Sequence, residues 1–190
     1  FKTLLLAALV LVNTIVAQNT QDTESSSWSV QDILFKFFEQ TGGLGWTSSA
    51  EWLSDDICGY EGITCYDDDE TDSRRIGHIK EVDVANHGLS GTVPVHIYGL
   101  PYLQKLNVRQ NPELVVDLTA VEEAQFLEVL EISQTATTYF GGLNKAYQSL
   151  KELHMSDLEV NGPIPNQLYQ LSNLEILVAN NNGFTGSVAS

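Results

Sequence analysis

The chain has 190 residues, of which 43% are hydrophobic and 18% are charged, so it is long enough for one folded domain and too apolar to be disordered throughout. Its formal net charge is −16, and no cluster of basic residues occurs. Nucleic acid and anionic lipid surfaces are therefore excluded as expected partners, because both attract proteins through clustered lysine and arginine.

The first 17 residues have the pattern of a secretory signal peptide. A basic residue, Lys2, precedes the apolar run LLLAALVLV, and small residues lead up to a cleavage site after Ala17. A membrane anchor is the alternative interpretation, but the run is shorter than the roughly 18 to 20 apolar residues that span a bilayer. We therefore expect a signal peptide at 1–17, a polar linker at 18–28, and an extracellular or cell-surface location.

Residues 29–41 are predicted to form an amphipathic helix. Ser29 and Asp32 have the spacing of a capping box, and Gly42 is a residue that commonly ends a helix. A membrane-surface or partner-binding helix is less favoured, because Lys36 is the only basic residue near it. The residues at helical spacing that would form the buried face are Ile33, Leu34, Phe37 and Phe38.

The segment 58–72 contains the two cysteines and a run of acidic residues. In a secreted chain, Cys58 and Cys65 are expected to form a disulfide, and two cysteines alone supply only half of a zinc site. The acidic run YDDDETD at 66–72 lacks the spacing of a known calcium loop and is interpreted as a solvated loop. We expect no metal, no cofactor and no catalytic residues, since no catalytic motif occurs.

An internal repeat begins near residues 76, 100, 124, 147 and 171. All twenty residues at offsets one, four, seven and nine of these repeats are hydrophobic, which makes a chance origin untenable. The leucines at 168–177 could instead form an amphipathic helix, but they share this repeat pattern. Each repeat is expected to form a short strand, a turn and a return segment, and neighbouring repeats would share one core.

The two clearest repeats, IGHIKEVDVANHGLSGTVP and YQSLKELHMSDLEVNGPIP, resemble the plant-type extracellular leucine-rich repeat. The segment CGYEGITC resembles the cysteine-paired N-terminal cap of that family, with Tyr60 where tryptophan is usual. The resemblance implies an α/β fold, namely a right-handed leucine-rich repeat solenoid with a parallel concave β-sheet and an N-terminal helical cap. The cap would span 29–75 and the repeats 76–190, the last of them incomplete.

Two departures from the family pattern are visible. Only Asn111 and Asn182 supply the inward amide at offset twelve, where the other repeats carry His87, Thr135 and Leu158. The second and third repeats also lack Gly-x-Ile-Pro, so irregular return segments are expected there.

Offsets five, six, eight, ten and eleven of each repeat are predicted to face solvent from the concave sheet. None of these twenty-five residues is aromatic, which disfavours stacking on a sugar, and their mixed polarity suits a peptide or protein ligand. The alternative is that this face only solvates a scaffold. The candidate ligand-binding residues are Lys80, Asp83, Lys105, Asn107, Arg109, Glu128, Glu131, Lys151, His154 and Glu175.

The leading hypothesis for function is a protein or peptide recognition module, the N-terminal part of a receptor-like leucine-rich repeat ectodomain. The alternatives are a soluble secreted inhibitor of an extracellular hydrolase and a structural or adhesive wall protein. Because the sequence stops inside its fifth repeat, we expect it to be a fragment, with any membrane anchor or kinase following Ser190.

Overall fold

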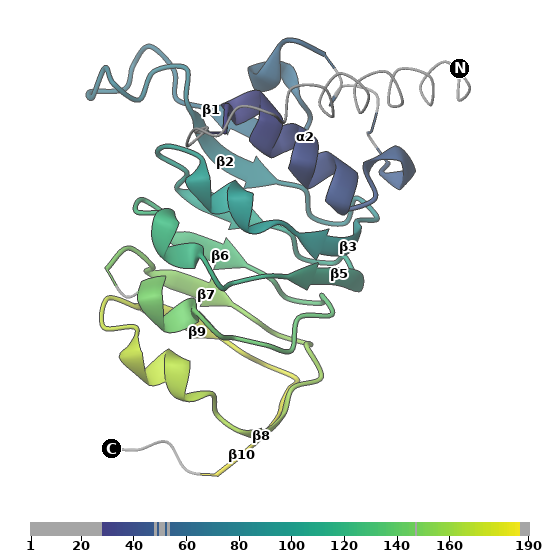
Figure 1. Cartoon of the computed structure of the whole chain (residues 1–190). Helices are drawn as coiled ribbons and strands as arrows, with labels where there is room; N and C mark the ends of the chain where they lie inside the picture. The colour runs from purple at the N-terminus through teal and green to yellow at the C-terminus, as the bar shows by residue number, and fades with distance from the viewer. Residues whose placement is uncertain (1–27, 48, 50–51, 53, 147, 187–190) are drawn as a thin grey trace, which may run out of the picture.

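The computed structural model describes residues 28–47, 49, 52, 54–146 and 148–186. The predicted signal peptide, and all of the predicted linker except Trp28, lie outside these residues. The chain runs from helix α2, which lies beside β1 and β2, to β9 and β10 at the opposite end of the molecule (Figure 1).

Helix α2 spans Val30–Gln40 and begins at the predicted capping box. Ser29 Oγ accepts a hydrogen bond from the Asp32 amide at 3.1 Å, and Asp32 Oδ2 accepts one from the Ser29 amide at 3.3 Å. Past the helix end, Gly42 has a φ of 73°, in the left-handed region that glycine adopts without steric cost. The predicted apolar face is buried, and it consists of Ile33, Leu34, Phe37 and Phe38.

A cluster of aromatic side chains packs against α2. The Trp52 ring centroid lies 4.8 Å from that of Trp46 and 5.3 Å from that of Tyr60. Trp46 Nε1 donates to the Thr41 carbonyl at 2.8 Å, and Trp52 Nε1 donates to the Glu61 carbonyl at 3.1 Å. The indoles therefore contribute apolar burial without leaving a buried donor unpaired.

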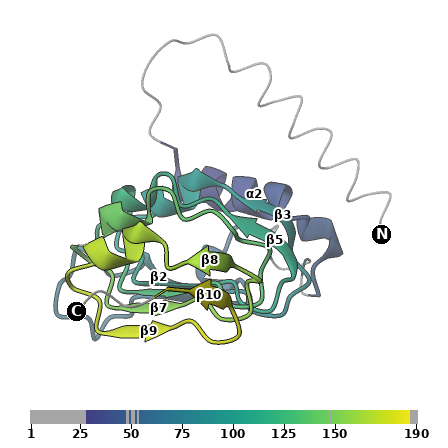
Figure 2. The ribbon, with the colours of Figure 1, turned by 90° about the horizontal axis from the view of Figure 1, so that it is seen from below.

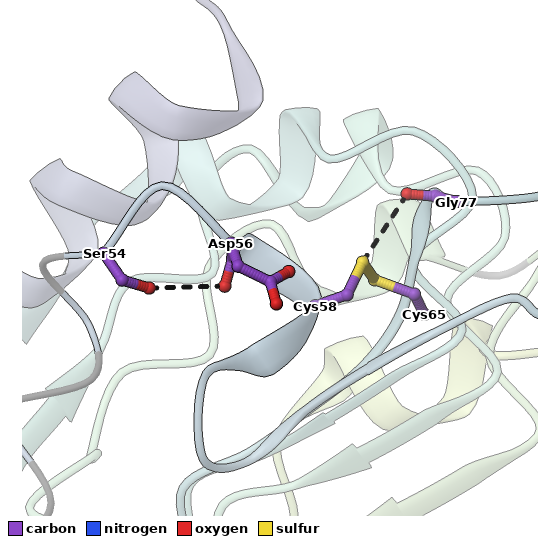
Figure 3. Close-up of a disulfide and its surroundings, with 5 residues drawn as sticks. All are labelled: Ser54, Asp56, Cys58, Cys65 and Gly77. Carbon is purple, nitrogen blue, oxygen red and sulfur yellow. Dashed lines mark hydrogen bonds between the residues drawn. A yellow bond between two sulfur atoms is a disulfide. The ribbon is translucent and has the colours of Figure 1, made fainter.

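A disulfide joins Cys58 to Cys65, as the sequence predicted. Cys58 lies in the 3₁₀ helix η3, Ile57–Gly59, and Cys65 ends the edge strand β1, Ile63–Cys65. Figure 3 shows the disulfide beside Gly77, whose carbonyl oxygen lies 3.9 Å from Cys58 Sγ. The bond thus ties the edge of the sheet to the segment between Trp52 and Tyr60 of the aromatic cluster.

A six-stranded sheet with the order β1-β2-β4-β6-β7-β9 forms one side of the molecule, opposite the helical segments (Figure 2). Strand β1 is antiparallel to β2, and the remaining pairs are parallel. Two smaller parallel pairs, β3-β5 and β8-β10, lie outside this sheet.

The other strands of the large sheet are β2 Ile79–Asp83, β4 Lys105–Asn107, β6 Val129–Glu131, β7 Glu152–His154 and β9 Ile176–Val178. The strands of the small pairs are β3 Ser90–Val93, β5 Glu113–Val116, β8 Asn161–Pro163 and β10 Gly183–Thr185. The remaining 3₁₀ helices are η1 Gly43–Gly45, η4 Val95–Gly99, η5 Val121–Glu123, η6 Leu143–Ala146 and η7 Asn166–Gln170.

The core consists of apolar residues that recur once in each repeat. Paired residues of successive parallel strands are 24, 24, 23 and 24 residues apart in the chain. Each coil therefore covers the apolar edge of its neighbour, which a single coil could not do for itself. Fully buried residues at the strand centres are Val82, Leu106, Leu130 and Leu153.

Two of the described residues that the repeat pattern predicted to point inward are exposed. Ile76 is 38% exposed because it lies in a turn before β2 begins at Ile79. Leu177 is 46% exposed because β9 pairs with β7 on one side only, and no described coil covers its other side.

The return segments differ from expectation in the second repeat. Residues Glu113–Val116 form β5, which pairs with β3, so the predicted irregular segment was wrong there. The alternation of exposed and buried residues in ELVV favours a strand even without the Gly-x-Ile-Pro motif. In the third repeat, Thr137 Oγ1 accepts a hydrogen bond from the Val116 amide at 2.9 Å, where a further strand would offer a carbonyl.

Candidate binding face

The candidate site lies on the side of the six-stranded sheet that points away from the core, called here the sheet face. Side chains alternate between the two sides of a strand, so the residues on either side of each buried central leucine or valine point outward. Strand register aligns these outward residues in two rows. The first row holds Glu81, Lys105, Val129, Glu152 and Ile176, and the second holds Asp83, Asn107, Glu131, His154 and Val178.

A polar network occupies the centre of the sheet face. Asn107 Nδ2 donates to both carboxylate oxygens of Asp83 at 3.0 Å. Lys105 Nζ lies 3.5 Å from Asp83 Oδ2 and 3.7 Å from Glu131 Oε1. Arg109 Nη1 lies 3.7 Å from Glu131 Oε2. These contacts connect strands β2, β4 and β6 and orient the charged groups in the absence of a partner.

Asn107 was predicted to face solvent and to contact a ligand, but its side chain is buried in the structure. The residue is only 3% exposed, because its side chain lies between the Asp83 carboxylate and the Arg109 amide, which donates to Asn107 Oδ1 at 3.2 Å. Its amide holds the Asp83 carboxylate in place, and little of its own surface is exposed.

The far half of the sheet face carries separate pairs of charged groups. Lys151 Nζ lies 2.9 Å from Glu128 Oε1, and His154 Nε2 lies 3.6 Å from Glu152 Oε2. Lys151 and the exposed Glu175 also line a hollow of about 400 Å³ beside the start of β9. These predicted residues therefore share the surface but do not join the central network.

Lys80 lies outside the central network, at the cap end of the row that continues through Gln104, Glu128, Lys151 and Glu175. Its Nζ is 5.7 Å from the centroid of the Tyr66 ring. Burial raises the pKa of the Tyr66 hydroxyl, which donates to the Tyr102 carbonyl at 3.2 Å. Lys80 therefore belongs to an aromatic group at the edge of the sheet, where the strands begin.

Two serine hydroxyl groups link successive strands on the sheet face, and they were not predicted from the sequence. The Ser156 amide donates to Ser133 Oγ at 3.0 Å, and the Asn180 amide donates to Ser156 Oγ at 3.0 Å. The signal was the recurrence of serine at offset ten. These serines bridge successive strands, and Ser156, which was expected to face solvent, is buried for this reason.

The acidic side chains at 66–72 form hydrogen bonds mainly with groups of the same segment and with Arg74. Arg74 donates to both carboxylate oxygens of Asp72, from Nε at 2.9 Å and from Nη2 at 2.8 Å. These bonds lower the pKa of Asp72 to about 2. Across the described part of the chain, no group of three or more histidine, cysteine, aspartate or glutamate side chains could hold a metal ion.

The sheet face can act chemically through hydrogen bonds and charge. The two outward rows carry one basic and four acidic side chains, so they have a formal charge of −3 with histidine neutral. Half-exposed Arg109, together with Glu131, offers a donor and an acceptor that lie 3.7 Å apart. The arrangement favours non-covalent recognition of a partner that carries complementary charges.

Solved structures that resemble this one include two plant ectodomain chains and a plant ice-binding protein. The BIR2 ectodomain from Arabidopsis thaliana has a TM-score of 0.63 and 21% sequence identity, over 82% of each chain. A chain from the BIR3–SERK2 complex of the same plant has a TM-score of 0.61 and 20% identity, over 81% of this chain and 82% of that one. A plant ice-binding protein has a TM-score of 0.65 and 25% identity, over 80% of this chain and 47% of that one.

Sequence similarity covers less of the chain. It is 35% identical over 60 residues to the receptor protein kinase WSS1 of Oryza sativa subsp. japonica, a match that spans 32% of this chain and 6% of that protein. No protein-family model matches the chain. Of the helices that the structure describes, none is long and apolar enough to cross a membrane. Together with the repeated strand register, the structural matches give the chain the leucine-rich repeat fold of plant ectodomains.

Proposed function

We propose that the sheet face recognises an extracellular protein or peptide and that it favours a ligand with basic side chains. The observation that carries this proposal is the central network, in which contacts among Asp83, Lys105 and Glu131 hold charged groups in place without a ligand. A preorganised polar surface loses little side-chain entropy when a partner binds. The net negative charge of the face favours approach of a basic partner.

The structural neighbours support a protein ligand. One of them was solved as a complex between BIR3 and SERK2, which are both plant proteins. The matching receptor kinase of Oryza supports a place at the cell surface. We propose that the repeats form a right-handed solenoid in which the sheet face is concave, with the cap at 29–75 and a signal peptide at 1–17.

The proposal is tested by using the secreted chain as bait against arrayed extracellular domains and synthetic basic peptides. Glu131→Lys reverses the charge at the centre of the network, and we expect it to weaken binding of a captured ligand by about tenfold or more. Binding should also fall as salt rises, because salt screens exposed charges. The measurement is the dissociation constant by biolayer interferometry.

Glu113→Lys is the matched control, because Glu113 is an exposed glutamate on β5, outside the six-stranded sheet. A captured ligand that binds both variants equally well would contradict the proposal. A captured hydrolase that loses activity in the complex would support the inhibitor alternative over the receptor one. Inhibition of ice recrystallisation that Glu131→Lys leaves unchanged would instead group the chain with its ice-binding neighbour.

A further inference from the structure

A row of aromatic residues lies at the edge of the six-stranded sheet where its parallel strands begin. His78, Tyr102 and Phe126 each occupy offset three of their repeats, just before β2, β4 and β6, and the strand register places them side by side. The same position in the next two repeats holds Ser149 and Asn173. None of the five belongs to the outward positions considered in the sequence.

The three rings contact one another in sequence order. The ring centroids of His78 and Tyr102 are 5.2 Å apart, and those of Tyr102 and Phe126 are 5.1 Å apart. Tyr102 has a φ of 64°, a backbone conformation that bulky side chains rarely adopt, and Phe126 is 41% exposed. The row therefore presents apolar ring surface to solvent.

Arg75 lies against one side of this row. Its guanidinium carbon is 5.3 Å from the Phe126 centroid, 5.9 Å from that of Tyr102 and 5.6 Å from that of Tyr66. Arg75 Nε is buried and has no hydrogen-bond partner among the described residues. The guanidinium therefore lies over Tyr102 and Phe126, and its Nε is 3.8 Å from Asp72 Oδ2.

Two hollows adjoin at Gln125 and Phe126 and form a groove along this edge. The hollow on the cap side has a volume of about 350 Å³, and Arg74, Arg75 and Tyr102 are among the residues lining it. The second hollow, of about 800 Å³, lies over η5 and η6, and Asn144, Lys145 and Gln170 are among its lining residues. Volumes of this size are typical of ligand sites.

The polar side chains that line the groove are mainly amides and equal numbers of acidic and basic residues. Asn144 Nδ2 donates to Gln170 Oε1 at 3.0 Å, and Gln125 lies at the junction of the two hollows. In the larger hollow, Lys145 pairs with Glu122 and lowers its pKa through a hydrogen bond. In the smaller one, Arg74 and Arg75 are matched by Asp72 and Glu123.

We infer that this groove binds a neutral oligosaccharide whose rings stack on Tyr102 and Phe126. Each sugar ring presents polarised C–H groups on its face, which the negative face of an aromatic ring attracts. Its hydroxyls both donate and accept hydrogen bonds, as do the side-chain amides of the groove. Because acidic and basic side chains balance, the groove offers no net charge to a polyanionic glycan. The site is separate from the protein-binding face proposed above.

The test is isothermal titration calorimetry of the full chain with neutral β-linked hexasaccharides of glucose, mannose and xylose. We expect at least one of them to bind and Phe126→Ala to weaken that binding by about tenfold. Phe126→Leu keeps the apolar bulk without the ring and should lose nearly as much. Tyr139→Ala is the matched control, because it removes an aromatic ring that is 68% exposed but does not line the groove.

Several outcomes would overturn the inference. They are no binding by any neutral hexasaccharide, binding of a galacturonate hexamer alone, or binding of decaproline that Phe126→Ala abolishes, which would make the groove a peptide site. Equal binding by wild type and Phe126→Leu would remove the stacking argument. Glu131→Lys should leave sugar binding unchanged, so this inference and the proposed protein recognition can fail independently.

Discussion

Asn111 shows how one buried side chain can hold two coils together. Its Nδ2 donates to the carbonyls of Val84 at 3.0 Å and Val108 at 2.8 Å, and its Oδ1 accepts from the Leu89 amide at 2.9 Å. Val84 and Leu89 belong to the preceding coil. Without the amide, these backbone groups would be buried and unpaired, a costly state.

Asn111→Ala is therefore expected to lower the free energy of unfolding by about 2–4 kcal/mol, which urea denaturation can measure. Asn182→Ala is the control, since Asn182 makes corresponding bonds to the Met155 carbonyl and the Val160 amide but is only partly buried. Its loss should be smaller, because water can replace its bonds. An equal loss of unfolding free energy in both variants would show that the burial of the asparagine does not determine how much it stabilises the protein.

At the scale of elements, a disulfide and a tyrosine hydrogen bond hold the two sides of η3 in the cap. The disulfide holds β1 to η3, and the Tyr60 hydroxyl, just after η3, donates to the Ser54 carbonyl at 2.7 Å. Strand β1 in turn covers β2, the first parallel strand of the sheet, with an antiparallel pairing. The cap thereby shields a sheet edge that would otherwise be open to pairing with another chain.

Removing the disulfide with the double substitution Cys58→Ser and Cys65→Ser should destabilise the protein by about 2.5 kcal/mol, because the short ring restricts the unfolded chain. The free energy of unfolding under non-reducing conditions measures this change. Wild type with a reducing agent should lose the same amount. A loss below about 1 kcal/mol in both cases would mean that the aromatic cluster alone maintains the cap.

Elements that depend on one repeat were predictable from sequence, and those that depend on neighbouring repeats were not. The strands and their inward residues follow from apolar spacing, and the capping box of α2 follows from Ser29 and Asp32. The burial of Asn107 requires the position of Asp83, one strand away, which no single repeat specifies. The aromatic row also becomes visible only when offset three is compared across coils in register.

At the scale of the whole molecule, the central residues of the strands are more deeply buried in the middle of the stack of coils than at the β9 end. Strands β4 and β6 have a parallel neighbour on both sides, and their central residues Leu106 and Leu130 are fully buried. Among the described strands β9 has one neighbour, and Ile176 and Leu177 are 44% and 46% exposed. In a stack where each coil contacts only those next to it, local stability should follow this difference.

Hydrogen exchange measured by mass spectrometry should therefore be slowest in peptides that cover β4 and β6 and fastest in those that cover β9 and β10. Exchange at β2 should also be slow, because the antiparallel strand β1 and the disulfide cover its outer side. Breaking that disulfide should accelerate exchange at β1 and β2 more than at β6, since β2 and β4 lie between β1 and β6 in the sheet. Uniform exchange across all of these strands would contradict this expectation, because it would mean that the coils unfold as a single cooperative unit.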